Sequence, residues 1–223
     1  MTASTTDEPQ PRRRLNKAAV ITGAVELADQ IGTIGTLTIR KLADHLGVKP
    51  MSLYHHVSNK DDVLDGMVDA VFAEIELPRP EGPWFEEMQQ RARSARAALK
   101  RHPWAIGMLD SRTNPGPATL THHDSVIACL RANGFAPAEV SHLMATIDAY
   151  VYGFALQEAA LPGDGAGDLT GLADDLMATF TASFPSLAWF TTEHVTQPGY
   201  AFGDEFEFGL ELVLDGLATR LAS

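Results

Sequence analysis

The sequence predicts an all-α protein in which a helix-turn-helix domain precedes a larger helical domain. Two observations predict this class: apolar residues recur at the three- and four-residue spacing of amphipathic helices, and no stretch alternates with the two-residue period of a strand between hairpin turns. A length of 223 residues allows two domains of unequal size. From the clusters of proline and glycine, we expect a disordered tail over 1–11, the helix-turn-helix domain over 12–76 and the second domain over 77–223.

Composition excludes several classes of protein. The chain is 45% hydrophobic and 21% charged, as globular proteins are, and its longest apolar run, 149–156, is far shorter than the about 20 residues of a membrane-spanning helix. No apolar segment follows the N-terminal charges, so a secretory signal is not expected and the protein is predicted to be cytoplasmic. The single cysteine, Cys129, allows neither an internal disulfide nor a Cys-based zinc site, and its apolar neighbours predict a core position.

Charge is distributed unevenly along the chain. The formal net charge is −12, yet residues 12–60 contain eight Lys or Arg against three Asp or Glu, a local charge of +5. Residues 61–223 contain nine basic and 24 acidic residues, a local charge of −15. A basic segment joined to an acidic one indicates a module that binds an anion and a second module with another task.

The stretch 38–60 has the spacing of a helix-turn-helix. Thr38 is a suitable N-cap for a short helix that we expect to run to about His45. Gly47 then supplies the left-handed residue of a tight turn between helices, and Leu53 buries the second helix. An ordinary pair of packed helices has the same features and stays an alternative at this point.

Cations at the starts of the predicted helices favour a nucleic-acid role. Helix N-termini carry a partial positive charge and prefer acidic side chains. Here, however, Arg40 and Lys41 lie in the first turn of one predicted helix, and Lys49 begins the next. Lys60 lies in the first turn of a third helix, for which Ser58 is the predicted cap. A phosphate backbone, held by exposed N–H groups together with Lys or Arg, accounts for this placement.

The remaining predicted helices carry continuous apolar stripes. One stripe runs from Val63 to Ile75, a second covers about 137–160 with Pro137 in the first turn, and the last covers about 204–222. The last helix is apolar on nearly all sides, which favours its burial against a second subunit. A helix buried within a single chain is the alternative.

Residues 12–75, and above all TIRKLADHLGVKPMSLYHHVSNKDDVLDGM, resemble the DNA-binding domain of the tetracycline-repressor family of bacterial transcriptional regulators. The leucine-alanine, glycine-valine, leucine-tyrosine and asparagine-lysine pairs of this stretch occur at the family's spacing. The resemblance implies a three-helix domain whose recognition helix, at about 49–55, enters the major groove. The residues assigned in this way to DNA contact are Thr38, Arg40, Lys49, Pro50, Met51, Ser52, Tyr54, His55, His56 and Lys60.

Within that set, the resemblance implies that the start of the recognition helix, residues 49–52, reads bases together with Arg40. It implies phosphate contacts for Thr38, Tyr54, His56 and Lys60. Lys49 or Arg40 is expected to read guanine, and Met51 to touch a thymine methyl group. The tetracycline repressor itself has a glutamine and a proline where this sequence has Pro50 and Met51, so we expect a different operator. For Tyr54, packing against the next helix is the alternative to a phosphate contact.

Residues of about 78–223 resemble the family's regulatory domain more loosely. The resemblance implies that the helices near 137–160 and 204–222 form a four-helix bundle with a second subunit, and that an effector pocket lies between the helices of this domain. We assign no metal and no cofactor, because no i, i+4 histidine pair or similar spacing is present, and tetracycline is not the predicted effector. The candidate pocket residues, each with core or surface packing as its alternative, are His102, Trp104, Met108, Arg112, His122, His123, Met144, Asp148, Tyr152 and Gln157.

Together these features predict a ligand-responsive transcriptional regulator, a repressor in the family's usual mode. It is expected to bind a near-palindromic operator as a homodimer and to be released by a small molecule. An architectural DNA-binding dimer without an effector is one alternative, and a helical enzyme with a non-local active site is another, although no P-loop, GxSxG or GxGxxG motif is present and no catalysis is predicted. The run Arg12–Arg14 is interpreted either as a flexible arm on DNA or as an exposed basic tail.

Overall fold

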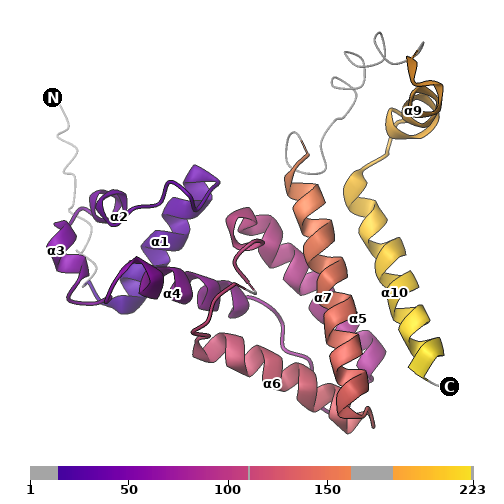
Figure 1. Ribbon diagram of the computed structural model, residues 1–223, viewed down its shortest axis with the longest axis horizontal. Coiled ribbons are helices and arrows are strands. Elements are labelled where there is room, and N and C mark those ends of the chain that lie inside the picture. The colour runs from indigo at the N-terminus through magenta and orange to yellow at the C-terminus, as the bar shows by residue number, and fades with distance from the viewer. Residues whose placement is uncertain (1–14, 110, 162–182, 222–223) are drawn as a thin grey trace, which may run out of the picture.

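The computed structural model describes residues 15–109, 111–161 and 183–221 (Figure 1). Every regular element in these ranges is helical, which confirms the predicted all-α class. The predicted tail over 1–11 and the arginines at 12–14 lie outside the described residues. Within the described ranges, no helix is long and apolar enough to cross a membrane.

Four short helices with one shared core form the N-terminal part of the chain. Thr38 caps the second helix as predicted, since its hydroxyl accepts a hydrogen bond from the Lys41 backbone N–H. Gly47 has a φ of 66°, the left-handed conformation predicted for the turn. Leu42 and Leu53 are buried in the common core of the helices. The helices are α1 (Lys17–Ile31), α2 (Ile39–His45), α3 (Pro50–Leu53) and α4 (Lys60–Phe72).

The recognition helix is shorter than predicted. Helix α3 ends at Leu53, whereas a helix over 49–55 was expected. The backbone N–H groups of His56 and Val57 both donate to the Leu53 carbonyl, at 2.8 and 3.0 Å. These bonds tighten the chain into a turn, and the side chains that follow α3 are therefore presented by this turn.

The cap of α4 also differs from the prediction. Asn59, and not Ser58, is the N-cap, because its side-chain oxygen accepts from the Asp62 backbone N–H at 2.8 Å. The Asp62 carboxylate accepts from the Ser58 backbone N–H at 2.9 Å. Asp62, at the third helical position, therefore bonds to the residue before the N-cap, whereas the reciprocal bond of a capping box would come from the N-cap itself.

Longer helices make up the second domain. In Figure 1, α5, α7 and α10 run side by side, and α6 crosses from them to α4. The predicted domain boundary at 76–77 lies in the segment between α4 and α5. Cys129 is fully buried in α6, as predicted. The elements are α5 (Trp84–Arg101), η1 (Pro103–Ala105), α6 (Pro117–Ala132), α7 (Pro137–Ala159), α9 (Pro185–Phe190), η2 (Thr191–Val195), η3 (Phe202–Asp204) and α10 (Glu205–Leu221).

Arg96 of α5 joins the long helices. Its guanidinium donates to both carboxylate oxygens of Glu158 on α7, at 2.9 and 2.7 Å. It also lies over the rings of Phe154 on α7 and Phe206 on α10, at 5.0 and 4.6 Å from their centroids. Burial alone would raise the pKa of Glu158, but Arg96 and Lys100 hold it below its ordinary value. The carboxylate therefore stays charged and keeps α5 fixed against α7.

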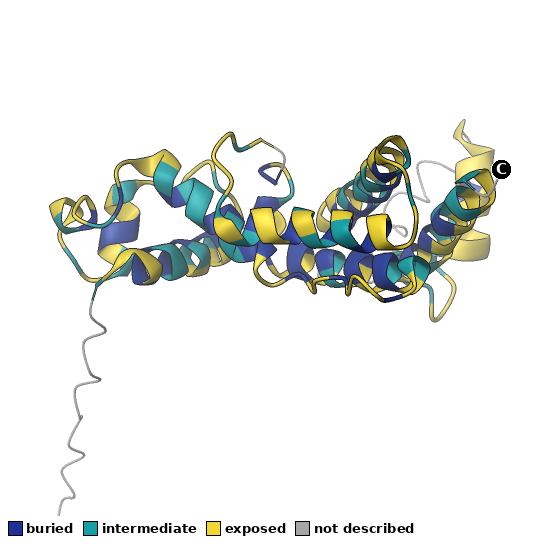
Figure 2. Ribbon diagram, turned by 90° about the horizontal axis from the view of Figure 1, so that it is seen from below, coloured by how far each residue is buried: buried dark blue, intermediate teal, exposed yellow. Residues whose placement is uncertain are grey.

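Helices α7 and α10 leave apolar side chains uncovered. Phe206 and Leu214 of α10 are fully buried, whereas Phe208 and Leu212 on the same helix are 70% and 65% exposed. Leu156 of α7 is 61% exposed. Figure 2 shows exposed positions beside buried ones on the helices near the C-terminus. A helix with apolar residues on both its buried and its exposed sides has a surface suited to a further partner.

Candidate nucleic-acid interface and effector region

The residues predicted to contact DNA lie on α2, α3, the following turn and the start of α4. Figure 1 places α2 and α3 at the end of the molecule remote from α10. Ser52 and His56 are half-buried. Met51 and Tyr54, 70% and 47% exposed, are the large side chains presented there. The other exposed members are Thr38, Arg40, Lys49, Pro50, His55 and Lys60.

Basic side chains on this surface lack carboxylate partners, unlike most of those in the second domain. From residue 77 onward, seven of the nine Lys and Arg residues form ion pairs with Asp or Glu, and the described exceptions are Arg131 and Arg220. Unpaired cations on one end of a molecule attract a polyanion. Within the described ranges, the N-terminal cations without an ion pair are Arg40, Lys41, Lys49 and Lys60.

Asp62 fixes the start of α4 beside Lys60. Its carboxylate accepts from Lys17 Nζ of α1 at 2.6 Å and from the Ser58 backbone N–H. The bond from Lys17 and then the bond from Ser58 hold the pKa of Asp62 below its ordinary value. Lys17 is thereby occupied within the domain, while Lys60 stays free to contact a ligand.

A row of carboxylates on α4 faces the segment that leads into α6. Asp61, Asp65 and Asp69 follow one another at four-residue spacing, so they share one side of the helix. Arg112 donates to Asp65 at 2.6 Å and to Asp61 at 3.1 Å, and Thr119 donates to Asp69 through both its backbone N–H and its hydroxyl. Arg112, one of the predicted pocket residues, thus connects the segment before α6 to α4.

His102 and Trp104, also predicted for the pocket, lie where the two domains meet. The His102 ring contacts Asp29 of α1 and Glu74, which follows α4. The Trp104 indole N–H donates to Asp29 at 2.6 Å. Both side chains are mostly buried. Like Arg112, they connect the second domain to residues of α1 and α4 or just after α4.

Two other pocket candidates, His122 and Asp148, meet at a buried arginine in the second domain. Arg91 of α5 donates through Nε to His122 Nε2 at 3.0 Å and through Nη2 to Asp148 Oδ1 at 2.6 Å. The Arg91 side chain is 3% exposed. Burial, followed by the positive charges of Arg91 and His123, lowers the pKa of His122 to about 3, so the ring is neutral at pH 7. Since Nε2 accepts, the proton is on Nδ1, and this buried N–H has no hydrogen-bond partner among the described residues.

The remaining pocket candidates include His123, whose ring lies edge-on to that of His122 with the centroids 5.6 Å apart. Met108 is buried, Tyr152 is half-buried and Gln157 is exposed. His123 hydrogen-bonds to a backbone carbonyl of its own helix at 2.8 Å. Met144 lines an apolar groove of about 610 Å³ between α6 and α7. The structure thus divides the ten candidates among the domain boundary, the Arg91 cluster and separate positions.

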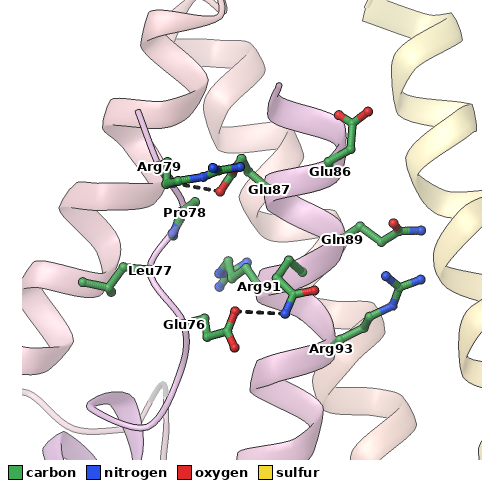
Figure 3. Close-up of a pocket in the computed structure, with 10 residues that line it drawn as sticks. Glu76, Leu77, Pro78, Arg79, Glu86, Glu87, Gln89, Arg91 and Arg93 are labelled. Carbon is green, nitrogen blue, oxygen red and sulfur yellow. Dashed lines mark hydrogen bonds and ion pairs between the residues drawn. The ribbon is translucent and has the colours of Figure 1, made fainter. Parts of the chain in front are cut away.

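A second cavity, of about 440 Å³, lies between α5 and the segment that follows α4 (Figure 3). Glu76 and Arg79 of that segment are held to α5 by Gln90 and Glu87. Figure 3 shows Arg91 pointing from α5 toward this segment. Sequence reasoning missed Arg91, because an arginine in a polar helix is normally a surface residue and its partners lie 31 and 57 residues away.

Known proteins resemble nearly the whole length of the chain. Residues 77–221 match the model of the tetracyclin repressor-like C-terminal domain. An HTH-type transcriptional regulator of Saccharopolyspora erythraea is 36% identical over 216 residues, which cover 95% of this chain and 89% of that protein. The chain belongs to the tetracycline repressor family. The HTH-type transcriptional repressor DrrR1 of Streptomyces coeruleorubidus is 32% identical over 226 residues, or 96% of this chain and 80% of the repressor.

Solved structures of the tetracycline repressor family share the fold. The TetR family protein ActR of Streptomyces coelicolor, in complex with actinorhodin, superposes with a TM-score of 0.75 at 26% identity. The match covers 93% of this chain and 97% of ActR. The resemblance found in the sequence is therefore confirmed for both halves of the chain, which is a transcriptional regulator of this family.

Proposed function

We propose that this member of the tetracycline repressor family represses transcription as a homodimer on a near-palindromic operator, and that a small molecule bound in the second domain releases it. The observation that carries the proposal is the set of unpaired cations Arg40, Lys41, Lys49 and Lys60 on an exposed helix-turn-helix surface. The repressor name of DrrR1 and the actinorhodin complex of ActR support the mode of action.

Selection of bound fragments from the source genome tests the proposal directly. The expected result is a palindromic sequence, bound by two recognition helices about 34–36 Å apart. Genes beside the selected site then suggest compounds, and those compounds are titrated against the protein–DNA complex. Absence of enrichment would contradict the proposal, and an operator that no compound releases would favour an architectural DNA-binding dimer.

Lys60 and Met51 are expected to contribute differently to operator binding. Lys60→Ala removes a phosphate contact, so it should weaken binding to all sequences and reduce the salt slope by about one unit per protomer. Met51→Ala removes an apolar contact to a base and should change the preferred base at one position in each half-site. Titrations at several salt concentrations, with the operator and with single-base variants, separate the two effects. An unchanged salt slope for Lys60→Ala would remove this residue from the DNA contacts.

Dimer formation is expected to use the uncovered apolar side chains of α7 and α10. Replacement of Phe208 and Leu212 by glutamate should abolish the dimer, because the new carboxylates would be buried between the subunits. Sedimentation of Phe208→Glu Leu212→Glu is expected to give a monomer, and operator affinity should fall to that of a half-site. Leu120→Glu is the matched control, since Leu120 is 57% exposed on α6. A dimeric double variant would place the interface elsewhere.

The effector is expected to bind beside the Arg91 cluster. The His122 Nδ1–H is buried without an acceptor, and such a donor costs about 1–3 kcal/mol unless it is paired. An effector that presents a carbonyl or hydroxyl oxygen would satisfy it. Movement of α5 and α6 on binding would then reach α4 through Arg112 and Thr119 and change the separation of the recognition helices.

A further inference from the structure

His102 and four neighbouring residues form a polar cluster between the two domains, here called the His102 cluster. Its other members are Asp29 of α1, Glu74 after α4, Arg101 of α5 and Trp104 of η1. His102 Nδ1 lies 2.8 Å from an Asp29 oxygen, and Nε2 lies 3.1 Å from a Glu74 oxygen. The His102 side chain is 7% exposed, so these two carboxylates are the principal partners of its ring.

Both contacts of the ring are hydrogen bonds only when both nitrogens carry a proton. A neutral imidazole has one N–H and one lone pair, so it donates to one carboxylate while the lone pair faces the other. An imidazolium donates to both. The Asp29 oxygen near His102 also accepts from the Trp104 indole at 2.6 Å, so this oxygen acts as an acceptor and not as a donor. The geometry therefore corresponds to protonated His102.

Histidine is the residue type in this cluster whose side chain ordinarily changes charge near neutral pH. Arg101 donates to Glu74 through Nε and Nη2, at 3.0 and 2.6 Å. Burial alone would raise the pKa of Glu74, but the bonds from Arg101 and His102 hold it below its ordinary value. Arginine stays charged throughout, whereas histidine side chains change charge between about pH 5 and 8.

We propose that protonated His102 is a positioning residue that fixes the DNA-binding domain against the second domain, so that operator affinity falls when His102 loses its proton. The proposal rests on the function proposed above. The bond to Asp29 holds α1 and the bond to Glu74 holds the end of α4. Deprotonation turns a lone pair toward one carboxylate and so removes one of the two hydrogen bonds that the His102 ring makes, while the bonds from Trp104 and Arg101 remain.

The sign of the pH effect follows from proton counting. The linked arrangement binds one proton more than the separated one, so a lower pH favours it. Domains that are already fixed lose less freedom when both recognition helices dock on DNA. Operator binding is therefore expected to be tighter at pH 6 than at pH 8, by about fivefold or more.

The first experiment follows the indole N–H of Trp104 by NMR between about pH 5 and 8, in the full-length protein without DNA. The chain has three tryptophans, and Trp104→Phe assigns the signal. The chemical shift is expected to titrate, because the same Asp29 oxygen accepts from Trp104 and His102. In His102→Gln it should stay constant. A constant shift in the unaltered protein would overturn the proposal whatever the outcome of the DNA experiments.

The second experiment measures operator affinity at pH 6 and pH 8 at constant ionic strength. His55 and His56 also lie on the predicted DNA-binding surface, so the informative quantity is the difference between the unaltered protein and His102→Gln. In His102→Gln, the operator affinity at pH 6 divided by the affinity at pH 8 should be about fivefold smaller than in the unaltered protein. His142→Gln, on an exposed position of α7, is the matched control and should keep the full ratio.

Asp29→Asn provides an independent variant if His102→Gln fails to fold. It keeps an oxygen acceptor for the Trp104 indole but removes the charge that holds His102, so it too should reduce the affinity ratio. Equal ratios in the unaltered protein and in either folded variant would overturn the proposal. Failure of all proteins to bind selected DNA would contradict the proposed function, while the NMR titration would still decide the role of His102.

Discussion

The triple variant Arg40→Ala Lys49→Ala Lys60→Ala is expected to lose at least about a thousandfold in operator affinity, because a dimer would lose six charge-assisted contacts. None of the three side chains forms an ion pair within the described part of the chain, so their removal should leave the stability of the domain nearly unchanged. Fluorescence anisotropy with the selected operator, together with thermal unfolding, measures both quantities.

A second triple variant controls for net charge. Lys100→Ala Arg131→Ala Arg220→Ala removes three exposed basic residues of the second domain and changes the formal charge by the same amount. Its operator affinity is expected to stay within about threefold of the unaltered protein, since distant charges are screened at physiological salt. Equal losses in the two triple variants would mean that net charge, and not the helix-turn-helix surface, determines binding.

Arg91→Ala is expected to destabilise the protein by about 3–5 kcal/mol, which is the usual consequence of removing one partner of a buried ion pair. The Asp148 carboxylate, 19% exposed, would lose its 2.6 Å partner, and His122 Nε2 would lose its donor. Urea unfolding monitored by circular dichroism measures the change in the free energy of unfolding.

A neighbouring ion pair provides the matched control for Arg91. Arg93 lies two residues away on the same helix and pairs with Glu207 at 2.6 Å, but both side chains are more than 40% exposed. Arg93→Ala should therefore cost at most about 1 kcal/mol. The double variant Arg91→Met Asp148→Leu should recover much of the loss. Similar losses for Arg91→Ala and Arg93→Ala would contradict a buried role for Arg91.

Local signals allowed the helix-turn-helix to be predicted from the sequence. Thr38 and Gly47 act within a few residues of their own positions, through a cap and a left-handed turn, so their roles are visible without knowledge of the fold. The predicted α3 was too long by one residue at its start and two at its end, and the predicted cap of α4 was one residue too early. Those boundaries depend on competing hydrogen bonds, such as the two to the Leu53 carbonyl, which spacing alone does not resolve.

The second domain could be predicted as a set of helices but not as a set of contacts. Arg91, His122 and Asp148 come from three helices, and no periodicity in the sequence indicates that they meet. Arg112 and His102 were selected as pocket residues by their chemistry, yet their partners lie on α1, on α4 and just after α4. The sequence-based prediction therefore identified several of the polar residues but not the partners that determine their roles.

Basic side chains are mostly paired with carboxylates in the second domain but unpaired on the helix-turn-helix surface. This difference affects how the protein approaches DNA. The second domain carries its basic residues mostly in ion pairs, and its acidic excess is repelled by a duplex. Encounters in which the second domain faces the DNA are therefore unproductive. When α2 and α3 face the DNA, the duplex attracts the protein over about a Debye length. We therefore expect the protein to diffuse along nonspecific DNA with α2 and α3 turned toward the duplex, and we expect this orientational advantage to disappear as the salt concentration rises.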